Sequence, residues 1–225
     1  MKKWMLLLGI CLLSIKNIHS QEVAIKSNLL YDATTTINLG VEFALADQWT
    51  LDISGNYNPW SFPQTELTKD ANGNIVGEPE SWDGKFRHWM LQPELRWWSC
   101  EKFNGHFFGA HVHAGTYNVG GLAFLPDGFG DGYDLKDPAT GNITHVKDGI
   151  QNKRFEGWLM GAGVSYGYHL VVSNRFSLEF SLGLGYSYLK YDKFDCKICG
   201  DKERSSYMHY LGPTKAGISA VFMLK

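Results

Sequence analysis

The stretch from Ile37 to Ala46 constrains the fold of this chain more than any other, because large apolar residues alternate in it with polar or small ones. Side chains of a β-strand point alternately to its two faces, so the alternation predicts a strand that is apolar on one face only. The other face carries a carboxylate and small residues, and we expect it to meet water or ion-paired partners. The apolar positions are Ile37, Leu39, Val41, Phe43 and Leu45, and the others are Asn38, Gly40, Glu42, Ala44 and Ala46.

The same alternation recurs along most of the chain and predicts eight strands. Pro93 lies inside one of them and predicts a local bulge, because proline removes a hydrogen-bond donor from the ladder. In the last strand we expect Thr214 and Ala216 to point outward and Lys215 inward. The predicted strands cover residues 23–31, 37–45, 49–58, 86–98, 106–120, 155–170, 176–190 and 206–224.

Connections between these strands are alternately short and long, and the short one at 32–36 breaks the series. Short turns at one end and long loops at the other are typical of barrels in bacterial outer membranes. The prediction is an all-β fold, a closed eight-stranded antiparallel transmembrane β-barrel with short periplasmic turns and long extracellular loops. The short turns are at 46–48, 99–105 and 171–174, and the long loops are at 59–85, 121–154 and 191–205.

The start of the chain predicts secretion. Residues 1–20 combine a basic beginning, an apolar run at 4–13 too short to span a bilayer, and the small Ser20 before Gln21, which is typical of a signal peptide. A single barrel over residues 21–225 is expected to follow. After the signal peptide no apolar run approaches the ~18 residues of a membrane helix. Lys and Arg total 21 against 23 Asp and Glu, so a net charge of −2 excludes a strong electrostatic attraction for nucleic acid.

The last strand carries a signal of its own. Lys215, Gly217, Ala220 and Phe222 follow the polar–glycine–hydrophobic–aromatic spacing of the strand that the barrel-assembly machinery recognises. The expected partners are this machinery during biogenesis and the lipid bilayer of the bacterial outer membrane.

Charged residues gather on the strand faces that are expected to point inward. The interior of an eight-stranded barrel is just wide enough for side chains to fill it, and buried charges must be paired. These residues predict a lumen filled by ion pairs, and the alternative is a selective path for protons or small solutes. They are Lys26, Glu42, Asp52, Glu94, Arg96, Glu179 and Lys215.

Histidines raise the question of a metal site. His111 and His113 share a strand face and lie one strand from His88 and near His169, and three imidazoles within reach could bind zinc. No cysteine or carboxylate motif with ligand spacing accompanies them. We predict hydrogen-bonded lumen histidines, paired with Glu94 or Asp52, and neither a metal nor another cofactor.

The cysteines form one short motif. Cys196 and Cys199 make a C-x-x-C in a predicted outer loop, on an oxidising secretion route, and we expect a local disulfide. The alternative is half of a metal site shared with another protein, because two thiolates alone leave zinc unsatisfied. Cys100 falls in a short turn at the other end of the predicted barrel, so it is expected to be an unpaired thiol.

Aromatic residues mark the long connections. Exposed aromatics on long loops are typical of partner contact, and the alternative is that they pack onto the mouth of the barrel. These candidates are Trp60, Phe62, Trp82, Phe124 and Phe129.

An enzyme is a further hypothesis, because some eight-stranded barrels modify lipid A. Such a site needs a serine, a histidine and an acid at the outer rim. No spacing singles out such a set, and serine and aspartate are ordinary loop residues. The candidates are Ser205, Ser206, His209, Asp192 and Asp195.

Specific motifs occur along the chain, at 26–32 (KSNLLYD), 57–60 (YNPW), 92–97 (QPELRW), 104–109 (NGHFFG), 156–158 (EGW), 161–168 (GAGVSYGY), 196–200 (CKICG) and 212–217 (GPTKAG). Taken together, these segments resemble an uncharacterised family of Bacteroidota outer-membrane β-barrel proteins, a domain of unknown function. The family is often encoded near fimbrial assembly components, which implies at most a role around surface fimbriae, and it has no established catalytic residues.

Three functions follow from these patterns. The first is an outer-membrane barrel with a filled, non-porous lumen and a structural or surface-interaction role through its long outer loops, with a fimbrial protein among the candidate partners. The second is an outer-membrane enzyme that modifies lipid. The third is a soluble secreted barrel that binds a small ligand, and an uncovered apolar outer face argues against it.

Overall fold

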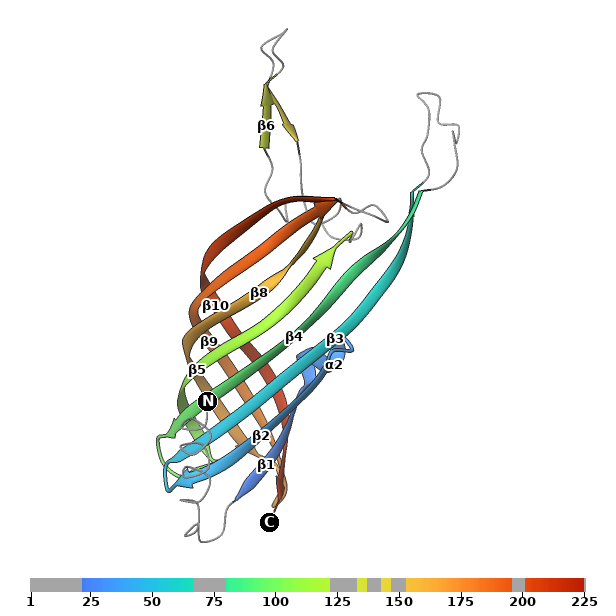
Figure 1. Ribbon diagram of the computed structural model, residues 1–225. Helices are drawn as coiled ribbons and strands as arrows, with labels where there is room; N and C mark the ends of the chain where they lie inside the picture. The colour runs from blue at the N-terminus through green and yellow to red at the C-terminus, as the bar shows by residue number, and fades with distance from the viewer. Residues whose placement is uncertain are drawn as a thin grey trace, which may run out of the picture.

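The computed structural model describes residues 22–66, 80–121, 133–136, 143–146, 153–195 and 201–224. Eight antiparallel strands form one sheet that closes into a barrel, in the order β1-β10-β9-β8-β5-β4-β3-β2 (Figure 1). The expected number of strands and their antiparallel order are thus confirmed. The strands are β1 (Val23–Asn28), β2 (Ile37–Ala46), β3 (Trp49–Glu66), β4 (Glu80–Trp98), β5 (Gly105–Gly120), β8 (Lys153–Val171), β9 (Phe176–Asp195) and β10 (Lys202–Leu224).

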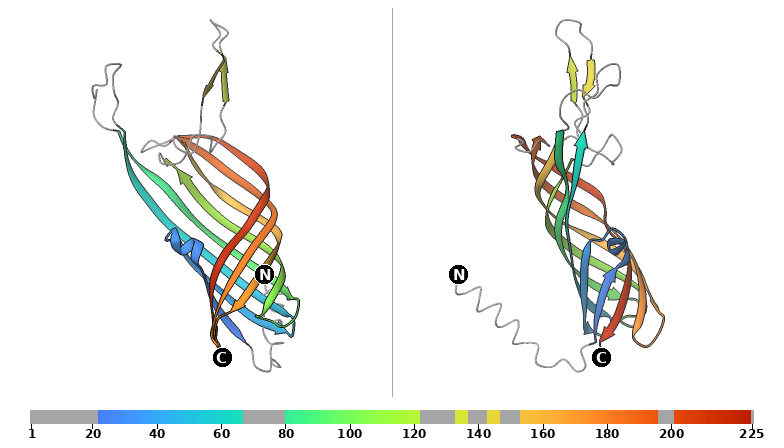
Figure 2. Two further views of the ribbon diagram at one scale, coloured as in Figure 1. Left: turned by 180° about the vertical axis from the view of Figure 1, so that it is seen from behind. Right: turned by 90° about the vertical axis from the view of Figure 1, so that its right-hand side faces the viewer.

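The two ends of the barrel differ. Short turns join β2 to β3, β4 to β5 and β8 to β9 at one end, where β1 also begins and β10 ends (Figures 1 and 2). We call this the turn end and the opposite one the loop end. Between β5 and β8 the chain contains a small separate hairpin, β6 (Tyr133–Lys136) and β7 (Ile143–Val146), inside the region predicted to be a loop.

The first predicted strand, 23–31, is wrong in its last three residues. The chain leaves β1 at Asn28 and forms the short helix α2 (Leu29–Ala33). The side chain of Asn28 accepts a hydrogen bond from the backbone N–H of Leu30 at 3.1 Å, which caps the helix. None of the helices in the described ranges is long and apolar enough to cross a membrane.

The bulge expected at Pro93 is absent. Pro93 lies opposite Ile53 of β3 without a change of register, and the pairing with β5 keeps one register on both sides of it. The missing N–H interrupts the ladder without shifting it. The register shifts that the described strands do contain lie between Ala44 and Ala46, between Lys202 and Arg204, and between Pro213 and Lys215.

The faces of the strands follow the sequence alternation. Glu42 is fully buried in the lumen, whereas Leu39 on the opposite face is 58% exposed. Across the described strands the buried set is dominated by polar and charged side chains and the exposed set by large apolar ones. This arrangement is the reverse of that in a protein folded in water.

A cluster of aromatic side chains lies inside the barrel at the turn end, and we call it the aromatic floor. It consists of the buried residues Trp98, Phe103 and Phe107. The ring centroid of Trp98 lies 5.8 Å from that of Phe103 and 5.0 Å from that of Phe107. Phe103 reaches this position from the turn between β4 and β5, where it has a positive φ of 59°.

Gly167 on β8 makes room for this floor. A Cβ at Gly167 would lie 2.2 Å from the Phe107 ring and 2.7 Å from the Phe180 carbonyl oxygen, whereas at Gly55 the nearest atom would be 3.7 Å away. We expect Gly167→Ala to lower the free energy of unfolding by about 1–3 kcal/mol through overpacking, and the control Gly55→Ala to change it by less than about 0.5 kcal/mol. Urea titration monitored by tryptophan fluorescence measures both, and equal effects would contradict the crowded position of Phe107.

Candidate functional site

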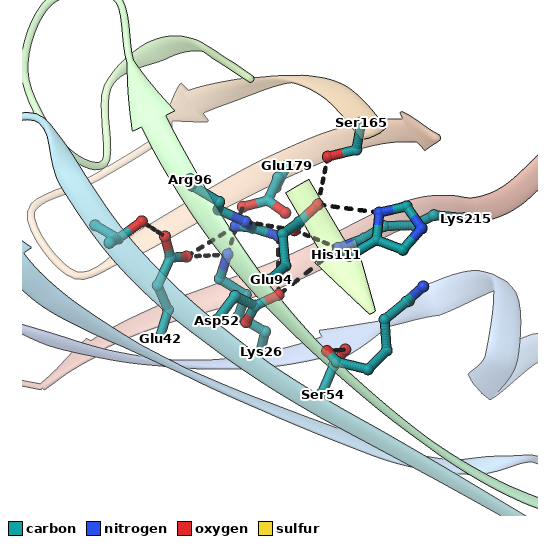
Figure 3. Close-up of polar contacts among 12 residues, drawn as sticks. Lys26, Glu42, Asp52, Ser54, Glu94, Arg96, His111, Ser165, Glu179 and Lys215 are labelled. Atoms are coloured by element: carbon teal, nitrogen blue, oxygen red, sulfur yellow. Dashed lines mark hydrogen bonds and ion pairs between the residues drawn. The ribbon is translucent and has the colours of Figure 1, made fainter. Parts of the chain in front are cut away.

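Arg96 lies inside the barrel, two residues from Trp98, and contacts four carboxylates (Figure 3). Its side chain is 1% exposed. Its Nε donates to Glu94 at 2.7 Å, and its Nη2 donates to Asp52 at 2.9 Å. Nη1 donates to both Glu42 at 2.9 Å and Glu179 at 3.0 Å. A guanidinium suits this position because its planar fork presents several donors at once.

Two lysines complete what we call the charge network. The Nζ of Lys26 forms ion pairs with Glu42 and with Glu179, the latter at 2.6 Å. The Nζ of Lys215 lies 2.5 Å from Glu94 and 3.7 Å from Asp52. The structure thus brings all seven of the predicted lumen charges into one set of contacts, supplied by β1, β2, β3, β4, β9 and β10.

Hydroxyl groups that the sequence interpretation did not single out also belong to this interior. Thr50 donates to Glu42, and Ser165 donates to Glu94. The indole Nε1 of Trp98 donates to the Thr50 oxygen at 2.9 Å, which joins the charge network to the aromatic floor. The alternation in the sequence could have indicated two of these residues. Thr50 shares a strand face with Asp52, and Trp98 shares one with Arg96 and Glu94.

The four candidate histidines do not converge on one point. His111 Nε2 lies 2.9 Å from the Thr214 hydroxyl, and His113 Nε2 lies 2.7 Å from the Ser187 hydroxyl. His169 lies beside Glu179 at 3.6 Å and packs edge-on against Trp98. Within the described ranges no three His, Cys, Asp or Glu side chains form a group that could hold a metal ion.

The candidate hydrolase residues are not assembled either. The Ser205 hydroxyl donates to Asp192 at 2.7 Å, but the ring Nδ1 of His209 contacts the Tyr186 hydroxyl at 2.5 Å instead. Hydrogen bonds from Lys202 and Ser205 lower the pKa of Asp192. Ser206 lies opposite Tyr191 in the ladder, and the side chain of Asp195 is outside the described part.

Trp60 and Phe62 lie on β3 and not in a loop, contrary to the expectation. Their rings meet edge to face at 5.3 Å. They line an open cavity of about 610 Å³ near the loop end, together with residues of α2, β4 and β10. We call this space the outer cavity, and its apolar lining includes Leu30, Trp60, Phe62, Phe86 and Pro213.

The remaining candidates lie partly within and partly outside the described residues. Trp82 belongs to the backbone of β4, but its side chain is not described. Cys100 is an exposed free thiol in the turn between β4 and β5. Phe124, Phe129, Cys196 and Cys199 lie outside the described residues, and so does the predicted signal peptide.

The fold and its interior define a class of small all-β proteins, in which eight antiparallel strands close around a buried network of charges. The chain belongs to the family described as protein of unknown function (DUF3575), whose model matches residues 5–224. Neither a curated protein nor a solved structure matches this chain.

The network predicts that Arg96 is indispensable for stability. Arg96→Met keeps similar volume but leaves four buried carboxylates without their shared cation, and we expect a loss of about 3–5 kcal/mol in the free energy of unfolding. Arg96→Lys should recover only part of this, because an ammonium cannot reach all four groups.

The matched control is Arg87→Met on the same strand. Arg87 is exposed and bonds to the Ser61 hydroxyl at 2.5 Å, so its replacement should cost less than about 0.5 kcal/mol. Urea titrations of the three variants give the comparison. Indistinguishable stabilities of Arg96→Met and Arg87→Met would rule out a central role for the guanidinium.

Proposed function

We propose that this protein is an outer-membrane β-barrel with a filled lumen, which conducts no solute and acts through contacts made at its loop end. The observation that carries the proposal is the reversed distribution of side chains. Its outward face is apolar around the whole barrel, whereas its interior holds Arg96 and four carboxylates. A continuous apolar surface of this kind is stable in lipid and is a liability in water.

Two levels of outward aromatic residues support membrane insertion. Aromatic side chains bracket a stretch of roughly 9–11 residues on several strands, which is the length that a tilted strand needs to cross the hydrocarbon. Aromatic residues gather at both water interfaces of outer-membrane barrels. The pairs are Trp49 and Tyr57 on β3, Trp97 and Trp89 on β4, and Tyr168 and Trp158 on β8, all exposed.

The layers inside the barrel support a lumen that is closed to solutes. The aromatic floor lies at the turn end, and the charge network lies directly above it, joined by the bond from Trp98 to Thr50. A mobile solute would have to break several ion pairs between nearly fully buried groups.

The loop end offers the surface for contact. β3, β4, β8, β9 and β10 continue beyond the upper aromatic level, and the outer cavity opens among α2, β3, β4 and β10. We propose a surface protein as the partner, and the family resemblance makes a fimbrial component the first candidate.

Substitution of an outward residue distinguishes a membrane barrel from a soluble ligand-binding barrel. Val164 is 66% exposed and lies between Trp158 and Tyr168 on β8. In a bilayer we expect Val164→Arg to cost about 2–4 kcal/mol, and Glu156→Arg, beyond Trp158 on the same face, to cost about 0–1 kcal/mol. In water both changes should stay within about 0.5 kcal/mol. Folding into vesicles at graded urea concentrations measures the difference, and two neutral variants would contradict membrane insertion.

Electrical recording tests the closed lumen. The mature protein, refolded into planar lipid bilayers, should give no stable conductance steps, because the aromatic floor and the charge network leave no open path. A general porin recorded in the same bilayers serves as the positive control. Stable, solute-selective steps that depend on the protein would show that the lumen is a channel.

A further inference from the structure

The barrel wall has a side opening between β3 and β10. β1 pairs with β10 only between Asn28 and Val23, and β2 pairs with β3 only up to Tyr57. Beyond these points β3 continues to Glu66 and β10 extends back to Lys202, and no described strand pairs with the edges that they turn toward each other. Figures 1 and 2 show α2 at the ends of β1 and β2, far short of the ends of β3 and β10.

Several backbone groups at this opening bond to side chains. Asn28 donates to the Ala216 carbonyl at 3.1 Å and accepts from the Ile218 N–H at 3.3 Å. On the other edge, Asn58 accepts from the Trp60 N–H at 3.0 Å. Pro213 has no N–H, and its carbonyl accepts from the Tyr210 hydroxyl at 3.1 Å. Strand edges that border hydrocarbon need internal partners of this kind, because lipid supplies none.

The outer cavity lies directly inside the side opening. Its lining comes from α2, β3, β4 and β10, the elements that surround the opening, and its volume of about 610 Å³ suits a small ligand. Its rings are arranged in pairs, with Trp60 edge-on to Phe62 at 5.3 Å and Phe86 edge-on to His88 at 5.4 Å.

Polar side chains in the lining are largely bonded to protein groups. Thr36 accepts from Asn58 at 2.8 Å, Thr214 bonds to His111, and Lys215 donates to Glu94. Thr34 donates to the backbone carbonyl of Tyr31 at 2.9 Å. A ligand therefore meets chiefly aromatic rings and aliphatic carbon, so the chemistry favours an apolar chain over a sugar, peptide or anion.

The outer surface beside the opening is apolar as well. Leu211 on β10 is 84% exposed, Tyr57 on β3 is 52% exposed and Leu29 of α2 is 41% exposed. The apolar surface thus continues from the outside of the barrel into the outer cavity. On β3 the opening begins at Tyr57, which belongs to the upper aromatic level, whereas on β10 the edge without a β1 partner includes Leu211 and Ala216. The opening therefore lies at the loop-end boundary of the proposed membrane-spanning part.

We propose that the outer cavity binds one acyl chain of an outer-leaflet lipid, which enters through the side opening between β3 and β10. This inference rests on the proposed membrane insertion. A lipid tail is the apolar chain that lies against the opening in a bilayer, and it requires no polar partner along its length. The bound chain would occupy a space that is lined by Leu30, Trp60, Phe62, Phe86 and Pro213.

Photocrosslinking tests the proposal with the full mature protein. The protein is folded into vesicles that contain a phospholipid with a diazirine near the end of one acyl chain, and labelled residues are located by mass spectrometry. We expect adducts at outward residues such as Val164 and also at the lumen-facing Trp60, Phe62 and Phe86. Labelling of neither group would contradict membrane insertion, and labelling of the outward residues alone would overturn the acyl-chain site while leaving membrane insertion intact.

Two matched variants make the test specific. Ala216→Trp places bulk at the opening, whereas Ala220→Trp places the same bulk on the same strand and face, where β10 pairs with both β1 and β9. We expect the first to reduce labelling of Trp60, Phe62 and Phe86 about tenfold, equivalent to about 1.4 kcal/mol in affinity, and the second to leave it unchanged. Heat-modifiable gel mobility confirms that both are folded, and equal labelling in the two variants would overturn entry through the side opening.

A second probe identifies the source of the chain. The same vesicles are prepared with a diazirine-bearing free fatty acid at an equal mole fraction in place of the labelled phospholipid. Labelling of the cavity by the phospholipid supports a membrane lipid as the ligand, and labelling by the fatty acid alone overturns that assignment.

Discussion

The interior of this barrel depends on the contacts of one guanidinium with four carboxylates. Glu94 lies on the same strand as Arg96, Asp52 on the adjacent β3 and Glu42 on β2, whereas Glu179 comes from β9, on another part of the ring. The contacts therefore join strands that no backbone ladder connects directly. Because four carboxylates would repel each other strongly in a space shielded from water, the closed sheet is stable only with cations among them.

The network carries more negative than positive side chains, with three cations facing four carboxylates. Thr50 and Ser165 donate hydrogen bonds to Glu42 and Glu94, which reduces the cost of holding these carboxylates away from water. The Arg96 guanidinium also lies over the Phe107 ring at 4.4 Å, so the aromatic floor contributes a cation–π contact from below. Charge, hydroxyl and aromatic groups thus act as one buried unit in the half of the barrel near the turn end.

Period-two alternation predicted the strands, their faces and the seven lumen charges, because in a closed sheet a side chain has only two directions to point. It could not predict α2, whose five residues form no periodic signal and which depends on Asn28 contacting β10 far along the sequence. We expected a loop from residue 59 onward, but β3 continues through Pro59 and Pro63 to Glu66. Prolines are tolerated there because that part of β3 has a described neighbour on one side only, β4. The aromatic rings of Trp60 and Phe62 consequently enter the barrel and line a cavity that alternation alone does not reveal.

The bulge between Pro213 and Lys215 explains why Thr214 was assigned to the wrong face of β10. Below it Ala216, Ile218 and Phe222 point outward, and above it the outward positions are Tyr207, His209 and Leu211, so the parity changes within the strand. A bulge places an extra residue in one strand, and here Thr214 and Lys215 both face inward, where they bond to His111 and Glu94. Thr214 therefore points into the lumen and not outward. Without the extra residue, β10 could not keep its apolar face outward on both sides of the bulge while supplying Lys215 to the charge network.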